Sequence, residues 1–263
     1  EIHGQRLTAD GQEIGPDDFQ ISTMRPDGES VYLAHDPAVS YNPTANEYLV
    51  VWKKLVWQSD DDQTPWSIYG QRLTADGQEI GADDFRVSID SGSEPAVSYN
   101  STTDEYLVVW EGSHPTKDGR QVYGQRVTKD GQTEGDIVMY SNGHSVRLPA
   151  VMYSPTTETY LIIWEGRNSQ IASADIYGQL VEGQTGRELG ANDRRLSDMQ
   201  SYNPRRGKAF QPAVSHNHTT DEYLVVWRGE TSSDGSSEEE IFGHLINHSD
   251  IVRWYDTYLP IVE

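Results

Sequence analysis

The 263-residue chain contains no cysteine, which excludes disulfide bonds, thiolate zinc sites and cysteine nucleophiles. Basic residues are few: 42 acidic residues stand against 20 basic ones, and the formal net charge is −22. Nucleic acid and anionic membranes would repel such a chain, so we expect neither as a partner. The longest apolar runs, such as LVVW, are strand-sized and far shorter than the ~20 residues that span a bilayer. We therefore expect no membrane insertion.

Helical periodicity and catalytic signatures are also missing. The chain has no HExxH, no GxSxG, no glycine-rich phosphate loop with its lysine and no EF-hand spacing of acids. The series Ser88-x-Asp90-x-Gly92 resembles the front of an Asp-box, but it occurs once and lacks the aromatic residue, so we interpret it as a turn. The chain begins at Glu1 without a signal segment, which favours a processed, exported product, although an arbitrary boundary would look the same.

One phrase of sixteen residues is present four times, at 37–52, 95–110, 149–164 and 212–227. In the second copy, PAVSYNSTTDEYLVVW, a β-rich segment leads through a cluster of turn formers into an apolar segment. That apolar segment is hydrophobic on both faces, which is typical of a strand covered on both sides. We expect its final tryptophans to form the core, each costing roughly 3–5 kcal/mol when changed to alanine: Trp52, Trp110, Trp164 and Trp227.

A second phrase, of the type IYGQRL, follows each copy of the first. It stands at 68–73, 122–127, 176–181 and 241–246, with a fifth copy at 2–7. Three copies run into an Asp-Gly turn, which is a strong hairpin signal, and a fourth strand follows. The repeating unit is therefore four antiparallel strands. The tryptophans are spaced by 58, 54 and 63 residues, a period typical of propeller blades.

The sequence thus predicts an all-β fold: a single β-propeller domain over 1–263, with most weight on five blades and four as the alternative. The segment Leu259–Val262 resembles Leu148–Val151, so a strand from the C-terminal end can complete an N-terminal partial blade. No second strand is visible for that composite blade; Ile251–Trp254 is either the fourth strand of the last unit or a substitute. The expected units are 37–94, 95–148, 149–211 and 212–258, with the partial blade formed by 1–36 plus 259–263.

Loop variation is uneven. The connections after the first and third strands of each unit are short and uniform, whereas the others differ in length and content. Recognition usually resides in variable loops on a rigid scaffold, so we expect a binding surface at the irregular end. The alternative is that these loops are unconstrained and that their tryptophans fold back as local plugs. The candidate binding residues are Trp57, Trp66, Tyr202, Arg205, Arg206, Lys208 and Phe210.

Three groups of residues suggest ions or modification, each with a simpler reading. His216 with His218, and His244 with His248, offer paired imidazoles, but they also stand where other units carry repeat residues. Sequons at Asn100, Asn217 and Asn247 permit glycosylation, although turns favour Asn in any case. Acidic loops are compatible with calcium as a cofactor or with simple solvation: Asp60, Asp61, Asp62, and Asp234 with 238–240.

Together, the PAVSYN, EYLVVW and IYGQRL phrases resemble the repeats of secreted and surface proteins of bacteria, in which an FVVVW-like strand is followed by an IYGQR-like strand. The resemblance covers nearly the whole chain. It implies an extracellular or cell-surface propeller-like repeat protein and transfers no catalytic residues. The arginine of the second phrase is absent at Leu180 and Leu245, so the third strand varies within this chain.

From these observations we expect a non-catalytic scaffold or adhesion module that binds a protein or a glycan. One alternative is a self-assembling subunit in which copies of the chain exchange strands. Another is a calcium-dependent lectin. A propeller glycosidase is the third, because propellers can hold carboxylates around their axis, but 42 acidic residues leave no means of nominating two from sequence.

Overall fold

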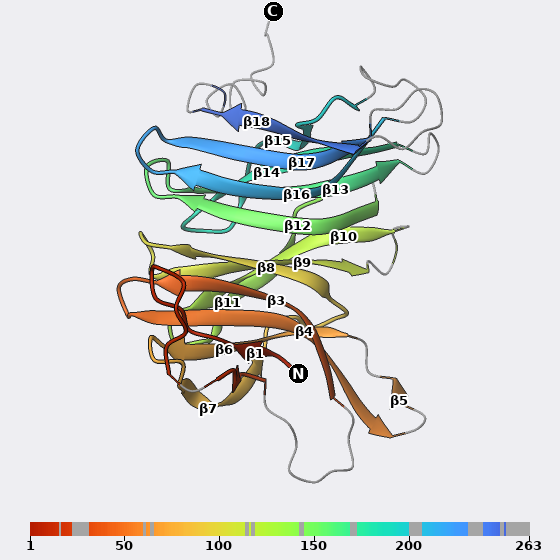
Figure 1. Ribbon diagram of the computed structural model, residues 1–263. Coiled ribbons are helices and arrows are strands. Elements are labelled where there is room, and N and C mark those ends of the chain that lie inside the picture. Colours follow the sequence, from red (N-terminus) through yellow and green to blue (C-terminus); the bar gives the residue numbers. More distant parts are fainter. Residues whose placement is uncertain are drawn as a thin grey trace, which may run out of the picture.

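The computed structural model describes residues 1–15, 17–22, 32–59, 62–63, 66–113, 116, 119–141, 145–168, 173–199, 207–230, 239–247 and 250. Over these residues the chain is built of antiparallel strands (Figure 1), which confirms the prediction of an all-β protein. Within the described part of the chain, no helix is long and apolar enough to cross a membrane.

The strands form four successive units, preceded by an N-terminal hairpin. In Figure 1 the strands of units I and II fill the lower half of the molecule and those of units III and IV the upper half, with β7 at the lower edge and β18 at the upper edge. The hairpin pairs β1 (His3–Gly4) with β2 (Phe19–Gln20). Unit I contains β3 (Tyr32–Asn42), β4 (Glu47–Ser59), β6 (Ser67–Thr74) and β7 (Glu79–Arg86), and unit II contains β8 (Ser93–Asn100), β9 (Glu105–Ser113), β10 (Arg120–Thr128) and β11 (Thr133–Met139). Unit III contains β12 (Ser145–Ser154), β13 (Thr159–Asn168), β14 (Ser173–Glu182) and β15 (Glu188–Arg195). Unit IV contains β16 (Lys208–Asn217), β17 (Glu222–Glu230) and β18 (Glu239–Ile246).

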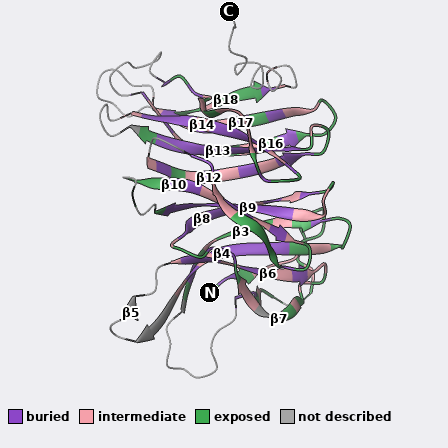
Figure 2. Ribbon diagram, turned by 180° about the vertical axis from the view of Figure 1, so that it is seen from behind, coloured by how far each residue is buried: buried purple, intermediate pink, exposed green. Residues whose placement is uncertain are grey.

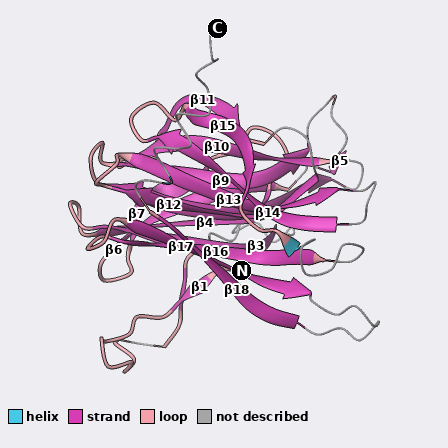
Figure 3. Cartoon of the chain, turned by 90° about the horizontal axis from the view of Figure 1, so that it is seen from above, coloured by secondary structure: helices cyan, strands magenta, loops and turns pink. Residues whose placement is uncertain are grey.

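Each unit pairs its strands in chain order, so consecutive strands are antiparallel neighbours. Units III and IV are joined into one larger sheet by a single parallel bridge between Ala174 and Lys208. Seen from above, most of the described turns lie at one end of the strands (Figure 3). These are the uniform turns that the repeat predicted, and the strand ends that lead into the variable connections point the opposite way.

The first strand of each unit begins earlier than the sequence suggested. The sequence places its proline at the first strand position, but pairing starts two to five residues before the proline and slips by a β-bulge on reaching it, as between His35 and Ala38. The proline is tolerated inside the strand because the bulge leaves it out of the hydrogen-bond ladder. The residue before the proline has a left-handed backbone, with φ between 49° and 55°: Asp36, Glu94, Leu148 and Gln211.

The segment after Trp52 also differs from expectation. The sequence predicts a variable connection after the second strand, yet β4 continues to Ser59, and β5 (Asp62–Gln63) pairs back onto it. The run Leu55-Val-Trp57 is apolar and contains no turn-forming residue, which is compatible with a strand that continues past Trp52. The extension lengthens the irregular end of unit I beyond that of the other units.

The core lies between successive units rather than within one of them. The second strands β9 and β13 are buried almost throughout, whereas β17 of unit IV alternates between buried and partly exposed residues (Figure 2); the repeat tryptophans Trp52, Trp110, Trp164 and Trp227 are all buried. Four apolar clusters fill the spaces between the hairpin and unit I, units I and II, units II and III, and units III and IV. The first strands β3, β8, β12 and β16 contact one another in that order.

Serine residues explain part of the repeat. A buried serine follows the fourth strand, and its hydroxyl oxygen accepts a hydrogen bond from the N–H that opens the third strand. Ser88 is one of these residues, so the front of its Asp-box-like series is a strand-closing feature of the unit. The donor–acceptor distances are 2.8–2.9 Å for all four pairs: Ile2 with Ser22, Ile68 with Ser88, Val122 with Ser141, and Ile176 with Ser197.

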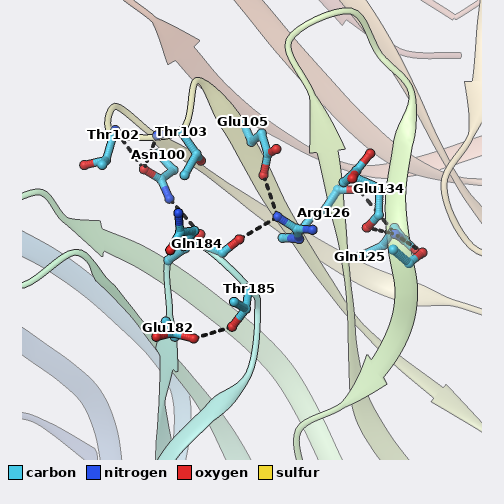
Figure 4. Close-up of polar contacts among 12 residues, drawn as sticks. Asn100, Thr102, Thr103, Glu105, Gln125, Arg126, Glu134, Glu182, Gln184 and Thr185 are labelled. Atoms are coloured by element: carbon cyan, nitrogen blue, oxygen red, sulfur yellow. Dashed lines mark hydrogen bonds and ion pairs between the residues drawn. The ribbon is translucent and has the colours of Figure 1, made fainter.

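The arginine of the IYGQRL phrase forms a polar contact with the next unit. Arg126 donates from Nη1 to Glu105 at 3.0 Å and to the main-chain oxygen of Gln184 in unit III at 2.7 Å (Figure 4). Arg6 makes the equivalent contact as a 3.2 Å ion pair with Asp76 of unit I. In unit III the position is Leu180, which is buried in the cluster shared with unit IV. Loss of the arginine there reflects an apolar contact to the next unit.

The described sheets do not close into a ring, and a seam remains on the outer faces of units I and IV. Val39 of β3 is 60% exposed, whereas its equivalent Val151 is 5% exposed. Leu224 of β17 is 44% exposed, whereas Leu107 is fully buried. The exposed stretches appear in Figure 2 on β3 and β18. A cleft of about 470 Å³ lies at the seam between the hairpin and unit I, lined in part by Phe19, Val39 and Leu73.

Candidate active site

The irregular end of the first strands gathers charged and aromatic side chains. We call this region the mouth and define it by the four bulge residues that precede the prolines: Asp36, Glu94, Leu148 and Gln211. Because β3 contacts β8, and β8 contacts β12, residues at equivalent positions of neighbouring units lie at the same level. Two of the four are acids, and they belong to neighbouring strands. The mouth therefore holds a pair of carboxylates that are 58 positions apart in the sequence.

Asp36 forms an ion pair in which its Oδ2 lies 2.5 Å from Nζ of Lys53. Lys53 belongs to β4, where it faces His35 across the strand pair. Its ammonium group also lies 5.3 Å from the ring centre of Trp66, which packs against the ring of His35 at 5.5 Å. The aromatic ring and the ammonium group therefore flank the Asp36 carboxylate on one side of the mouth.

Glu94 is half-buried, and burial is the main cause that raises the pKa of its carboxyl group. The negative charge of Asp36 raises this pKa further, and that of Glu111 adds to it; Lys53 and Arg147 act in the opposite direction. A carboxyl group whose pKa is raised by burial and by a neighbouring carboxylate is a feature that enzymes use to separate an acid from a base. Glu94 shows this upward shift, with Asp36 as the neighbouring carboxylate.

The residue after each repeat tryptophan is charged in all four units and supports the rim of the mouth. Glu111 is buried, and its Oε1 accepts bonds from Ser93 at 2.9 Å and Arg120 at 2.5 Å. Glu165, 1% exposed, pairs with Arg167 at 2.6 Å. Glu111 is paired with an arginine of the neighbouring strand β10, and Glu165 with an arginine of its own strand β13, so both positions have a structural role. The Asp36 and Glu94 carboxylates are the more accessible pair.

Several residues expected to bind ligands have described positions. Trp66 lies at the mouth, as given above. Lys208 opens β16 and pairs with Glu230 at 3.5 Å, while the Phe210 ring lies 6.0 Å from Lys208 and 5.2 Å from Arg228. Both residues are thus on the unit IV side of the irregular end.

The side chains of the other predicted site residues lie outside the described part of the structure. Trp57 and Asp62 lie on strands β4 and β5, but their side chains are outside the described part of the structure. The remaining candidates are outside the described residues altogether: Asp60, Asp61, Tyr202, Arg205, Arg206 and Asp234. The calcium prediction rests on four of these positions and stays a prediction.

The sequon residues Asn100 and Asn217 carry turn hydrogen bonds. Asn100 is fully buried; its Oδ1 accepts from the N–H groups of Thr102 and Thr103, and its amide donates to Gly183 (Figure 4). Asn217 makes the same turn bonds to Thr219 and the residue that follows it. Their presence in the repeat is explained by these bonds.

Sequence reasoning missed both carboxylates of the mouth. The signal available was internal: the position before Pro-Ala-Val varies among Asp36, Glu94, Leu148 and Gln211, while the phrase after it is nearly fixed. Because the phrase itself is nearly fixed, a residue that varies directly before it is one whose identity the fold does not constrain. Only the stacking of β3 against β8 shows that the two acids are neighbours.

Comparison of the sequence with protein families and with curated proteins finds no match. Solved structures do resemble the fold. An α-L-arabinanase from Penicillium chrysogenum complexed with arabinobiose aligns with a TM-score of 0.55 at 12% identity, over 82% of this chain and 64% of that one. An α-L-arabinofuranosidase from Lactobacillus brevis gives 0.53 at 11%, over 86% and 77%. An N-acetylgalactosamine deacetylase from F. plautii, in complex with blood group B trisaccharide, gives 0.51 at 11%, over 94% and 81%.

These likenesses contradict the expected non-catalytic scaffold or adhesion module, because all three similar structures are enzymes that act on carbohydrates. The error has a physical reason. Cleavage of a glycosidic bond requires two carboxylates placed by the fold and no contiguous sequence signature, so missing motifs do not exclude it. Adhesion and self-assembly gain no support.

Proposed function

We propose that this protein is a carbohydrate-active enzyme that hydrolyses glycosidic bonds at the mouth. The observation that carries the proposal is the carboxylate pair on neighbouring first strands: Asp36, ion-paired with Lys53, and Glu94, whose pKa is raised by burial and by Asp36. The fold likeness to an arabinanase and an arabinofuranosidase supports it and makes arabinofuranosides the first substrates to test.

In the proposed chemistry, the different surroundings of Glu94 and Asp36 give the first the role of acid and the second the role of base or nucleophile. Protonated Glu94 gives its proton to the glycosidic oxygen as the bond to the anomeric carbon breaks. Ionised Asp36 acts at the anomeric carbon, either by taking a proton from the attacking water or by forming a glycosyl ester that water then hydrolyses. In both routes water supplies the new hydroxyl group. In the first route, Asp36 gives up the proton it has taken to solvent and Glu94 is reprotonated from solvent; in the second, Glu94 takes the proton of the attacking water directly. The anomer first released, read by NMR, distinguishes the two routes.

Trp66 supplies a candidate sugar platform. Its ring is held by His35 and Lys53 beside Asp36, and aromatic faces pack well against the apolar faces of sugars. We expect Trp66→Ala to raise KM more than it lowers kcat, because stacking contributes to binding in the ground state as well as in the transition state.

The activity test uses aryl α-L-arabinofuranosides, arabinan and a panel of other aryl glycosides. Asp36→Asn and Glu94→Gln should each lower kcat/KM by roughly 10²–10⁴-fold, the usual contribution of a positioned acid or base. Glu134→Gln, an exposed acid on β11, is the matched control and should keep full activity. No sugar release from any substrate by the wild-type protein would refute the proposal, as would full activity in both mouth variants.

We further propose that the units belong to a five-bladed propeller whose open blade is completed by Leu259–Val262. These residues lie outside the described part of the chain. Support comes from the LPxV pattern shared with Leu148–Val151 and from the exposed seam, where Val39 lacks the cover that its equivalents have. A strand placed there would cover the cleft between the hairpin and β3.

The absence of cysteine allows a direct cross-linking test of this blade. By the repeat alignment Ile261 corresponds to Ala38, which packs in the same cluster as Val97 of the next unit. The pair Val39→Cys/Ile261→Cys should therefore form a disulfide within one chain on oxidation. Ala38→Cys/Val97→Cys is the positive control. Cross-linking of the control pair without cross-linking of the seam pair would contradict the five-blade proposal.

The location of the protein and its calcium dependence remain proposals. An extracellular site of action fits the proposed action on polymeric carbohydrate and the resemblance to the repeats of secreted and surface proteins of bacteria. Calcium binding to the acidic loops that contain Asp60–Asp62 and Asp234 would appear as a calcium-dependent change in melting temperature. A glycan is the partner class that the proposed activity requires.

A further inference from the structure

Two histidines meet at the turn between β16 and β17 in unit IV. Nδ1 of His216 lies 3.1 Å from Nδ1 of His218, and the rings cross at 74° with centres 4.8 Å apart. The His216 side chain is fully buried, whereas His218 is exposed. The other ring nitrogen of His216, Nε2, lies 2.9 Å from Oδ1 of Asp221.

Comparison with the other units shows what is particular to this turn. Unit II has Tyr99 at the place of His216, and the Tyr99 hydroxyl donates to Asp104 at 2.8 Å. Asp221 is the counterpart of Asp104, so His216 keeps the contact between ring and aspartate. Unlike tyrosine, however, the imidazole has a second nitrogen. Unit IV alone places another histidine, His218, beside that nitrogen, at the position of Ser101.

We propose that His216 and His218 bind a divalent transition-metal ion through their Nδ1 atoms. An ion ~2.0–2.1 Å from each of two imidazole nitrogens at a tetrahedral angle needs those nitrogens about 3.3 Å apart, close to the observed 3.1 Å. Small rotation of the exposed His218 ring aims its lone pair at the ion. The proposal is independent of glycosidase activity, since this turn lies at the end of the strands opposite the mouth.

Asp221 orients the His216 ring and does not itself coordinate the ion. Its carboxylate accepts the Nε2 proton of His216, which leaves the lone pair on Nδ1 free for a metal. The same oxygen accepts a 3.0 Å bond from the Ser154 hydroxyl of unit III, so the turn is anchored to its neighbour. A ligating histidine oriented by a carboxylate is a common feature of metal sites in proteins.

The donor set indicates the type of ion. Two neutral imidazoles favour zinc, nickel, copper or cobalt over calcium or magnesium, which prefer oxygen ligands. Within the described residues, no group of three or more histidine, aspartate and glutamate side chains is close enough to hold an ion. Water therefore completes the coordination, and we expect binding weaker than that of a structural zinc site with four protein ligands.

Zn²⁺ titration by calorimetry and Co²⁺ titration by visible absorption test the site in the intact protein. His216→Tyr and His218→Ser install the residues that unit II carries, so both should fold, and each should lower the affinity at least tenfold. Asp221→Asn should weaken binding by about 10–100-fold, the usual effect of losing a residue that orients a ligand. His3→Ala, an exposed histidine outside this turn, should bind as the wild type does.

A second variant transplants the site. Tyr99→His combined with Ser101→His places the same pair beside Asp104 in unit II and should add one Zn²⁺ ion per chain. Unchanged Zn²⁺ affinity and stoichiometry in His216→Tyr and His218→Ser would overturn the proposal and leave the pair as a direct hydrogen bond. If either variant failed to fold, absence of a second site in the transplanted protein would overturn it equally.

Discussion

The side-chain amide of Asn100 donates to the main-chain oxygen of Gly183 at 2.9 Å, although the two residues are 83 positions apart. Asn100 ends the first strand of unit II, and Gly183 opens the hairpin of unit III. The same side chain holds its own turn through Thr102 and Thr103. One asparagine thus fixes a local turn and docks the next unit on it (Figure 4).

Asn100→Ala should lower the free energy of unfolding by about 1–3 kcal/mol, because it leaves a buried carbonyl oxygen unsatisfied and removes the turn bonds. Asn217→Ala is the matched control: it removes the same turn bonds at an exposed position. Urea denaturation of both variants isolates the bond between units. Equal losses in the two variants would show that the bond to Gly183 contributes nothing.

Leu107 and Leu224 occupy the same position in units II and IV but differ in burial. Leu107→Ala should cost about 2–5 kcal/mol, since it opens a cavity between units II and III. Leu224→Ala should cost clearly less, because Leu224 faces the seam and is 44% exposed. Thermal or urea unfolding measures both. Equal destabilisation would indicate that the seam is covered in solution.

Glu188 makes the stability depend on pH. Burial, with a smaller contribution from Asp193, raises the pKa of its carboxyl group to about 7. The folded state then binds the Glu188 proton more tightly than the unfolded state does. Protonation of Glu188 therefore stabilises the fold fully below the unfolded-state pKa of ~4.3, and this contribution is lost as the pH rises through about 7. Glu188→Gln should leave the melting temperature at pH 4 nearly unchanged and raise it at pH 8.

The matched control for Glu188 is Glu134→Gln, in which an exposed carboxylate is neutralised. It should shift the melting temperature equally at both pH values. A Glu188→Gln profile parallel to that of the wild type between pH 4 and pH 8 would contradict the assignment.

Arg147 tunes the proposed catalytic acid. Its positive charge lowers the pKa of Glu94, opposing burial and Asp36. Arg147→Met should therefore raise that pKa, and the alkaline limb of the kcat/KM profile should move to higher pH. Arg187→Met, an exposed arginine on the hairpin of unit III, should leave the profile unchanged. A shift to lower pH in Arg147→Met would contradict the role assigned to Glu94.

Much of the fold was predictable because the signal repeats. The same sequence phrases recur in each unit. The hydrophobic pattern of these phrases accounts for the strands, and Asp-Gly or Asn-Thr residues account for the turns. The predicted strand boundaries were wrong where the structure overrides a local sequence rule. Proline did not begin the first strands, because a bulge at residues such as Asp36 admits it inside a paired strand.

The candidate site was not predictable in the same way. Trp66 was nominated from its loop, and it does lie beside Asp36. The acids themselves were indistinguishable among 42 until the packing of neighbouring strands joined Asp36 to Glu94. The expectation of a non-catalytic protein failed for the same reason, since it rested on motifs that a carboxylate pair does not require.

The sequence by itself determined the strands, their order within each unit and the buried tryptophans, because hydrophobic alternation and turn chemistry act over a few residues. Tertiary structure decided which residues face one another across units: Asp36 with Glu94, Asn100 with Gly183, and Arg126 with Gln184. Those contacts depend on how one sheet stacks on the next, and a side chain's pKa and hydrogen-bond partners are set by that surrounding structure.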